Sequence, residues 1–156
     1  IVFGDWSSDV CSSDLMQNHL LYYFRFIRLG LEFDLPIRMP SRESLARYRA
    51  GHLRTLVTAL GIVYPDYFLL EMKKQPGQTA QQFWLEQLRQ LKPGVTELFI
   101  HPALDTDEMR GITNSWQWRY GEFRAFLDDP DIQNCIREEG IILIGYRPLR
   151  DLQRGK

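Results

Sequence analysis

Cysteine is scarce in this chain, which has only Cys11 and Cys135 among its 156 residues. Two thiols do not form the disulfide framework of a small secreted domain or the knuckle of a structural zinc site. No apolar run approaches the roughly 20 residues that cross a bilayer. Residues 1–15 lack the basic start and continuous apolar middle of a signal peptide. These absences predict a cytoplasmic protein without a membrane span.

An excess of charge of one sign is also absent. The 19 basic and 20 acidic residues leave a net charge of -1 at pH 7. A protein that binds nucleic acid or an anionic membrane is expected to carry a basic surface, so neither is an expected partner. The composition, 44% hydrophobic and 25% charged, is typical of one globular domain with a sizeable core.

Residues 1–15 differ in character from the rest of the chain. Between Asp5 and Leu15, serine and aspartate alternate without apolar periodicity, and the stretch can be back-translated into a common sequencing-library adapter. We therefore expect residues 1–15 to be non-native and to form no strand or helix, and residues 16–156 to be natural sequence. A natural flexible arm is the alternative. On the first interpretation, an upstream part of the natural protein is missing.

From residue 16 onward, apolar periodicity alternates between that of helices and that of strands. Helices are expected over 17–33, 41–60, 79–91, 116–127 and 131–139, and strands over 67–70, 95–100 and 141–146. An extended segment is expected over 35–39, a loop over 101–114 and a fraying tail over 150–156. The alternation predicts a parallel sheet wrapped by helices, and the small number of strands predicts a partial (β/α) barrel-like fold.

The most informative stretch of the sequence ends at His101. An apolar run begins after Pro93-Gly94 and stops at His101-Pro102. In α/β folds, the carboxyl ends of parallel strands are the usual place of catalytic residues. Proline ends the strand and favours an extended backbone at the histidine. The alternative is a half-buried histidine at a strand end with no role in chemistry.

Several ordered blocks of residues 16–156 resemble the YdjC-like carbohydrate deacetylases, which include the chitooligosaccharide and hopanoid-biosynthesis deacetylases. Residues 93–102 (PGVTELFIHP) resemble the late-strand motif of that family, and residues 35–40 (LPIRMP) resemble the segment after its middle histidine motif. Trp116 to Arg119 and Glu122 resemble its downstream arginine and acidic pair. The blocks at 127–130 and 140–149 resemble its closing helix and strand.

The resemblance implies a metal-dependent hydrolase that removes acetyl groups from N-acetylated amino sugars. Magnesium or zinc would polarise the amide carbonyl and activate water. His101 matches the His-Pro position of the family and is the expected general acid, which protonates the departing amine. The residues expected to support His101 or line the sugar pocket are Glu97, Arg119, Glu122 and Trp116. The alternatives are a solvated Arg119–Glu122 ion pair, a glutamate at the core edge and packing tryptophans.

The metal ligands of the family, an aspartate and two histidines from earlier motifs, have no counterpart in this chain. His19 and His52 are interpreted as helix-surface residues. Asp105, Asp107 and Glu108 are interpreted as an exposed acidic loop. We therefore expect the metal ligands to be absent from this chain.

Three hypotheses follow from this pattern. In the first, residues 16–156 are the carboxy-terminal portion of a single deacetylase domain that is active only in its full-length parent. In the second, the chain is a non-catalytic interaction module derived from the same fold. In the third, it is a different barrel hydrolase that uses His101 without metal. The sequence leaves open the sugar, the metal and the formation of a homodimer.

Overall fold

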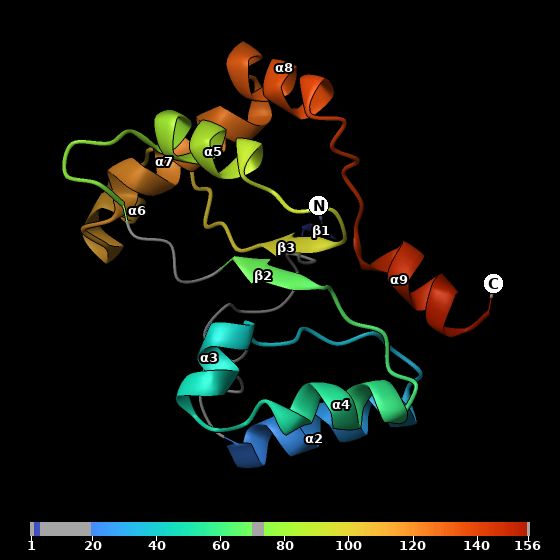
Figure 1. The fold of residues 1–156 in the computed structure, drawn as a ribbon. Coiled ribbons are helices and arrows are strands. Elements are labelled where there is room, and N and C mark those ends of the chain that lie inside the picture. Colours follow the sequence, from blue (N-terminus) through green and yellow to red (C-terminus); the bar gives the residue numbers. More distant parts are fainter. Residues whose placement is uncertain (1, 4–19, 70–73, 156) are drawn as a thin grey trace. The chain divides into compact units, whose positions relative to one another are not determined.

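The structure, a computed structural model, describes residues 2–3, 20–69 and 74–155 (Figure 1). The chain divides into two compact units. Unit 1 consists of Ile1–Leu70, Gly94–Leu98 and Leu143–Lys156, and unit 2 consists of Glu71–Pro93 and Phe99–Ile142. In the described part of the chain, no helix is both long enough and apolar enough to cross a bilayer.

Unit 1 contains a parallel sheet. Its strands are β1 (Val2–Phe3), β2 (Tyr67–Leu69) and β3 (Thr96–Leu98), and β3 lies between the other two. Tyr67 pairs with Thr96, and Leu69 pairs with Leu98. The predicted parallel α/β architecture is confirmed. The barrel-like arrangement stays a prediction, because the described residues form a sheet of three short strands.

The strand β1 contradicts the expectation that residues 1–15 form no strand. Val2 pairs with Glu97 and Phe3 pairs with Leu98, in parallel. The sequence begins with three apolar residues, two of them β-branched, and such residues favour strands. Beside them, β3 offers an edge of backbone donors and acceptors that another strand can pair with. Serine and aspartate dominate only the part of this segment that follows.

The core of unit 1 is built by helices that pack against each other. The helices before β2 are α2 (Leu20–Glu32), α3 (Arg42–Arg47) and α4 (His52–Ala59). Figure 1 shows α2 and α4 running along each other, and Tyr23 and Ile27 of α2 are buried in one cluster with Leu53 and Val57 of α4. The predicted helix over 17–33 is confirmed for residues 20–32, while 17–19 lie outside the described residues.

The single helix predicted over 41–60 is two helices. Ser41 caps α3 as expected, because its Oγ accepts a hydrogen bond from the Ser44 N–H at 3.0 Å. The chain then leaves the helical conformation at Arg49, which has a φ of 54°. Gly51 follows, and α4 begins at the next residue. The apolar spacing continues across this break, so periodicity alone does not reveal it.

Unit 2 is a helical unit. Its helices are α5 (Ala80–Arg89), α6 (Asp107–Ile112), α7 (Trp116–Leu127) and α8 (Pro130–Glu138). The predicted capping box of α5 is present: Thr79 Oγ1 accepts from the Gln82 N–H, and Gln82 Oε1 accepts from the Thr79 N–H. The helices α7 and α8 lie within one residue of their predicted bounds. The predicted loop over 101–114 contains α6, whose first turn Thr106 caps.

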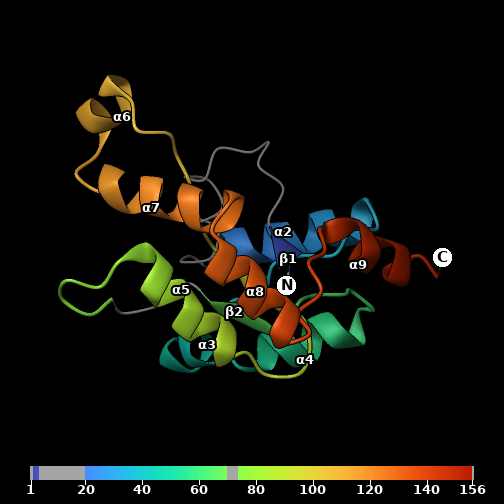
Figure 2. The same ribbon diagram turned by 90° about the horizontal axis from the view of Figure 1, so that it is seen from above.

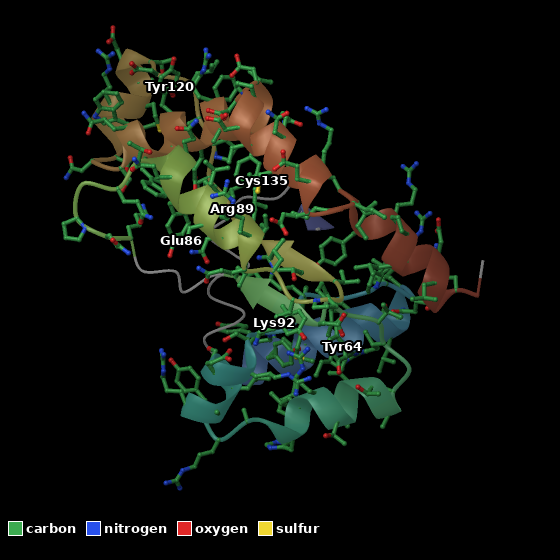
Figure 3. All side chains as sticks on the ribbon, turned by 45° about the horizontal axis from the view of Figure 1, so that its top comes forward. Tyr64, Glu86, Arg89, Lys92, Tyr120 and Cys135 are labelled. Carbon is green, nitrogen blue, oxygen red and sulfur yellow. The ribbon has the colours of Figure 1, made fainter. Side chains whose placement is uncertain are left out.

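The helix α5 packs closely against α7 and α8 (Figures 1 and 2). A Cβ added at Gly121 of α7 would lie 2.8 Å from the Ala80 Cβ, so glycine permits this approach. On the other side of α5, Arg89 lies beside Cys135 of α8 (Figure 3). Burial raises the pKa of the Cys135 thiol, and Arg89 partly offsets this. This cysteine is therefore a packing residue with an unreactive thiol.

The structure contradicts the predictions for the carboxy-terminal segment. Residues 141–146 do not form a buried strand: only Ile144 forms an isolated bridge, and Ile142 is 76% exposed. The chain then enters α9 (Tyr146–Gln153), where a fraying tail was expected. A run of apolar residues is typical of both a buried strand and an extended connection, and only packing distinguishes them.

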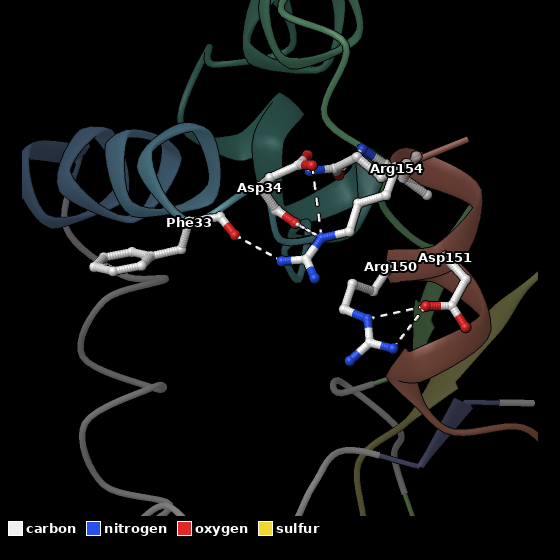
Figure 4. Close-up of polar contacts among 7 residues, drawn as sticks. Phe33, Asp34, Arg150, Asp151 and Arg154 are labelled. Atoms are coloured by element: carbon white, nitrogen blue, oxygen red, sulfur yellow. Dashed lines mark hydrogen bonds and ion pairs between the residues drawn. The ribbon is translucent and has the colours of Figure 1, made fainter. Parts of the chain in front are cut away.

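The helix α9 is bound to the rest of unit 1. Leu149 is buried, and Gln153 Oε1 accepts a hydrogen bond from the Val63 N–H at 2.8 Å. Arg154 donates from its guanidinium to the carbonyl oxygens of Phe33 and Asp34 (Figure 4). These side-chain contacts across the sequence hold a helix that its own polar composition does not predict.

Replacing Gly94 with alanine is expected to destabilise the chain more than replacing Gly77. Both glycines have a positive φ, which costs an alanine about 1–3 kcal/mol. An added Cβ at Gly77 meets nothing within 4 Å, whereas at Gly94 it would lie 2.8 Å from Asp66 Oδ2. That carboxylate accepts a hydrogen bond from the Val95 N–H, so moving it breaks a contact. Urea unfolding of Gly94→Ala and Gly77→Ala measures the difference, and equal losses would rule out the steric contribution.

Candidate active site

Glu97, in the middle of β3, is the most deeply buried of the predicted site residues, with 0% of its surface exposed. The Arg38 Nε–H donates to Glu97 Oε1 at 2.7 Å, and the Tyr146 hydroxyl donates to Oε2 at 2.6 Å. The Arg38 guanidinium also lies over the Phe68 ring, 4.9 Å from its centroid. Each carboxylate oxygen thus has a strong donor, as a buried charge requires.

These contacts favour a supporting role for Glu97. Its carboxylate has no exposed surface and is engaged by Arg38 and Tyr146, so a substrate does not reach it. Burial, together with the adjacent carboxylate, raises the pKa of Tyr146 far above its usual value. The hydroxyl therefore remains a proton donor at neutral pH.

Neither of the two donors was among the predicted site residues. Arg38 lies in the LPIRMP block, so the resemblance pointed to its segment, but no role followed from the residue itself. Tyr146 was placed at the end of a predicted strand, which hid its position at the start of α9. The available signal was Glu97 itself, because a glutamate inside an apolar strand needs a buried cation or donor.

His101, in unit 2, is held through its backbone by Glu122. The His101 N–H donates to Glu122 Oε2 at 2.9 Å. The imidazole is half-buried and makes a T-shaped contact with the Phe99 ring, with the centroids 4.5 Å apart. Glu122 lies on α7 and is 3% exposed. The structure therefore brings together two predicted site residues, and Glu122 fixes the main chain at His101.

Trp84 holds the other oxygen of Glu122. Its indole N–H donates to Glu122 Oε1 at 3.3 Å. Trp84 lies on α5, is 1% exposed, and packs edge-on against Phe83 and Phe126. A buried indole needs an acceptor for its N–H, and here that acceptor is the carboxylate that holds His101. The sequence showed Trp84 only as an apolar residue of a helix.

The predicted roles of Arg119 and Trp116 stay predictions, and the structure adds further contacts of both residues. The Arg119 carbonyl oxygen accepts a hydrogen bond from the Ala103 N–H at 3.1 Å, which ties the loop after His101 to α7. Glu122 is buried, so it is not the solvated ion-pair partner that was the alternative for Arg119. The Arg110 guanidinium lies over the Trp116 ring, 4.9 Å from its centroid, and covers one face.

Lys74 adds a cation to this part of unit 2. Its ammonium group lies 3.5 Å from the centroid of the Trp118 ring, and that ring makes a T-shaped contact with the Phe83 ring. Desolvation lowers the pKa of Lys74, and the Glu122 carboxylate opposes that shift. The Glu122 carboxylate thus favours the charged form of Lys74.

The described residues do not fit a divalent metal. Within the described ranges, no group of three or more His, Cys, Asp or Glu side chains is placed to hold an ion. His52 is exposed at the start of α4, as predicted, and His19 lies outside the described residues. Asp105 accepts two hydrogen bonds from Arg110, which lowers the pKa of its carboxyl group. The described side chains therefore support no step through a metal.

Comparisons with known proteins support the family resemblance that the sequence blocks indicated. The family model of the YdjC-like proteins matches residues 16–138. A carbohydrate deacetylase of Thermoanaerobacter pseudethanolicus (strain ATCC 33223 / 39E) is 29% identical over 134 residues, which are 86% of this chain and 49% of that protein.

A solved structure shares the fold. It is that of a candidate cellobiose-phosphate cleavage protein of Enterococcus faecalis V583, with a TM-score of 0.64 and 18% identity, and the match covers 88% of this chain and 50% of that one. The chain thus spans about half the length of both relatives. Because the family model matches most of its residues, the chain belongs to the YdjC-like protein family.

Proposed function

We propose that this chain is the carboxy-terminal part of a metal-dependent carbohydrate deacetylase, which hydrolyses the acetamide of N-acetylated amino sugars. The carrying observation is His101: it follows β3 in the motif of the family, and the buried Glu122 holds its backbone N–H. The curated relative that is 29% identical is named as a carbohydrate deacetylase, which supports the class of reaction. The substrates we propose are of the chitooligosaccharide or hopanoid-glucosamine type.

In this proposal His101 is the general acid. An amine leaves poorly from a tetrahedral intermediate unless its nitrogen is protonated as the C–N bond breaks. A ring N–H of His101 supplies that proton. The T-shaped contact with the Phe99 ring restricts the side chain of His101, and the hydrogen bond to Glu122 restricts its main chain. A restricted acid loses less entropy when the substrate binds.

The other predicted site residues hold His101, its neighbouring segments or the sugar in place and take no part in proton transfer. Glu122 holds the main chain of His101, and the Arg119 carbonyl holds the loop that follows. Glu97 anchors β3 from inside unit 1. Trp116 presents an aromatic face on which a sugar ring stacks, and Arg110 covers the other face. The magnesium or zinc ion belongs to the full-length protein, with ligands from outside this chain. We place that protein in the cytoplasm.

A second candidate is a non-catalytic interaction module of the same fold. The observation that favours it is the absence, among the described residues, of a side-chain cluster that could hold a metal. A module of this kind would keep the packing around Glu97 and Glu122 and would lack turnover. The two candidates therefore differ in whether the full-length protein hydrolyses acetylated sugars.

The test uses the full-length protein that contains this chain. We expect it to release acetate from N-acetylglucosamine oligomers, to lose that activity in a metal chelator, and to recover it when magnesium or zinc is added. Activity that persists in chelator would favour a metal-free hydrolase. A natural start at Met16, with no acetate released from any of these sugars, would contradict the deacetylase proposal and favour the module.

A further inference from the structure

The helix α9 is attached to unit 1 at both of its ends. At its carboxyl end, the Gln153 side chain accepts from the Val63 N–H and donates to Asp34 Oδ1 at 2.9 Å. Arg154 donates to the carbonyl oxygen of Asp34 at 3.0 Å (Figure 4). At its amino end, the Tyr146 hydroxyl donates to Glu97 Oε2. The contacts with Asp34 are exposed, whereas the Tyr146 hydroxyl reaches a carboxylate with 0% of its surface exposed, so the two attachments differ in strength.

The family match ends at residue 138, before α9 begins at Tyr146. The family comparison therefore assigns no role to this helix. Its first residue nevertheless contacts the middle of β3, the strand that leads within three residues to Phe99, Ile100 and His101. A structural support for the strand thus comes from residues that lie beyond the match of the family model.

Three chain segments meet at the Glu97 carboxylate. Arg38 comes from the extended segment after α2, Glu97 from β3 and Tyr146 from α9. Glu97 also pairs through its backbone with Phe68 of β2, whose ring lies against the Arg38 guanidinium. Removal of the hydroxyl would leave Oε2 with no surface exposed to water and without its donor. A buried carboxylate oxygen without a hydrogen-bond donor costs free energy, and a shift of β3 would lower that cost.

We propose that Tyr146 and Arg38 are positioning residues: they fix Glu97, and through it β3, so that Tyr146, the first residue of α9, is part of the catalytic framework. The framework role follows from contacts within unit 1 alone. Its importance for catalysis rests on the proposed function, because β3 continues into the segment that carries His101.

The first test measures amide hydrogen exchange in the 156-residue chain. Tyr146→Phe keeps the ring and removes the hydroxyl, and we expect the β3 amides to exchange about tenfold faster or more. The matched control is Arg154→Ala, which weakens the other end of α9 without touching Glu97. That variant is expected to speed exchange in α9 and to leave β3 at the wild-type rate. If Tyr146→Phe does not fold, Glu97→Gln replaces it, since the neutral amide weakens the same contact.

The second test measures turnover in the full-length protein. Tyr146→Phe is expected to lower kcat about tenfold with KM unchanged, and Arg154→Ala is expected to leave both near wild type. Unchanged β3 exchange in Tyr146→Phe would overturn the framework role. Faster β3 exchange with unchanged kcat would overturn the catalytic importance. If the wild-type protein showed no deacetylation while β3 exchange responded as expected, the proposed function would fail and the framework role would stand.

Discussion

Replacing His101 with alanine in the full-length protein is expected to lower kcat for deacetylation by about 10²–10⁴-fold. The reason is that the departing amine then leaves without a positioned proton donor. KM is expected to change little, because a general acid acts mainly on the transition state. Acetate release under saturating substrate measures the effect. The metal content of the variant is expected to equal that of the wild type, since His101 is assigned as the acid.

His52→Ala is the matched control for this variant. His52 is exposed at the start of α4, so its removal is expected to leave kcat and the unfolding midpoint unchanged. A His101→Ala protein that keeps the wild-type unfolding midpoint and full turnover would contradict the general-acid assignment. A His101→Ala protein that loses metal would instead identify the histidine as a ligand.

Replacing Glu97 with leucine is expected to destabilise the 156-residue chain by about 3–5 kcal/mol, the cost of breaking one side of a buried ion pair. The Arg38 side chain is only 14% exposed, and it would lose the carboxylate that it contacts at 2.5 Å. The Tyr146 hydroxyl would lose its acceptor at the same time. Urea unfolding followed by circular dichroism measures the change in the free energy of unfolding.

The double variant Arg38→Met/Glu97→Leu separates charge from volume. It removes both charges and keeps apolar bulk, so we expect it to recover at least half of the loss seen in Glu97→Leu. If the double variant is no more stable than Glu97→Leu, the unpaired Arg38 charge does not cause the loss. The loss then comes from the shape of the glutamate side chain or from its hydrogen bond with Tyr146. Adding Tyr146→Phe to the double variant distinguishes these two outcomes, because that change removes the remaining unsatisfied hydroxyl.

Local signals in the sequence predicted the parts of the fold that depend on neighbouring residues. Thr79 and Gln82 cap α5 through each other, so the start of that helix is encoded within four residues. Ser41 caps α3 in the same local way. The Asp129-Pro130 pair marks the start of α8, where the Asp129 carboxylate accepts from the next backbone N–H groups. These contacts do not depend on the rest of the chain.

The failures concern residues whose conformation is set by distant contacts. Arg49 adopts a left-handed backbone just after α3, and the spacing of the apolar residues on either side of it does not indicate this break. The helix α9 depends on Val63 and Asp34, roughly 90 and 120 residues away from their partners in the sequence. A window of ten to twenty residues contains no information on such contacts, so a polar tail was predicted in place of a helix.

Some residues of the candidate site could likewise be predicted from the sequence, and others could not. His101 was predicted from its place at a strand end and from the family resemblance, Glu122 from the resemblance alone, and the structure joins them by one hydrogen bond. Arg38, Tyr146 and Trp84 were missed because their roles follow from the buried carboxylates that they contact. A buried glutamate predicts that a partner exists, but it does not say which residue that partner is.

The close approach of α5 and α7 at Ala80 and Gly121 has a consequence for how this sequence can change over time. Trp84 lies one helical turn after Ala80, and Glu122 directly follows Gly121. A larger residue at either small position would separate the helices and stretch the indole–carboxylate hydrogen bond that supports His101. We therefore expect these four positions to tolerate substitution only together: the two small residues set the helix separation that the hydrogen bond between the other two requires.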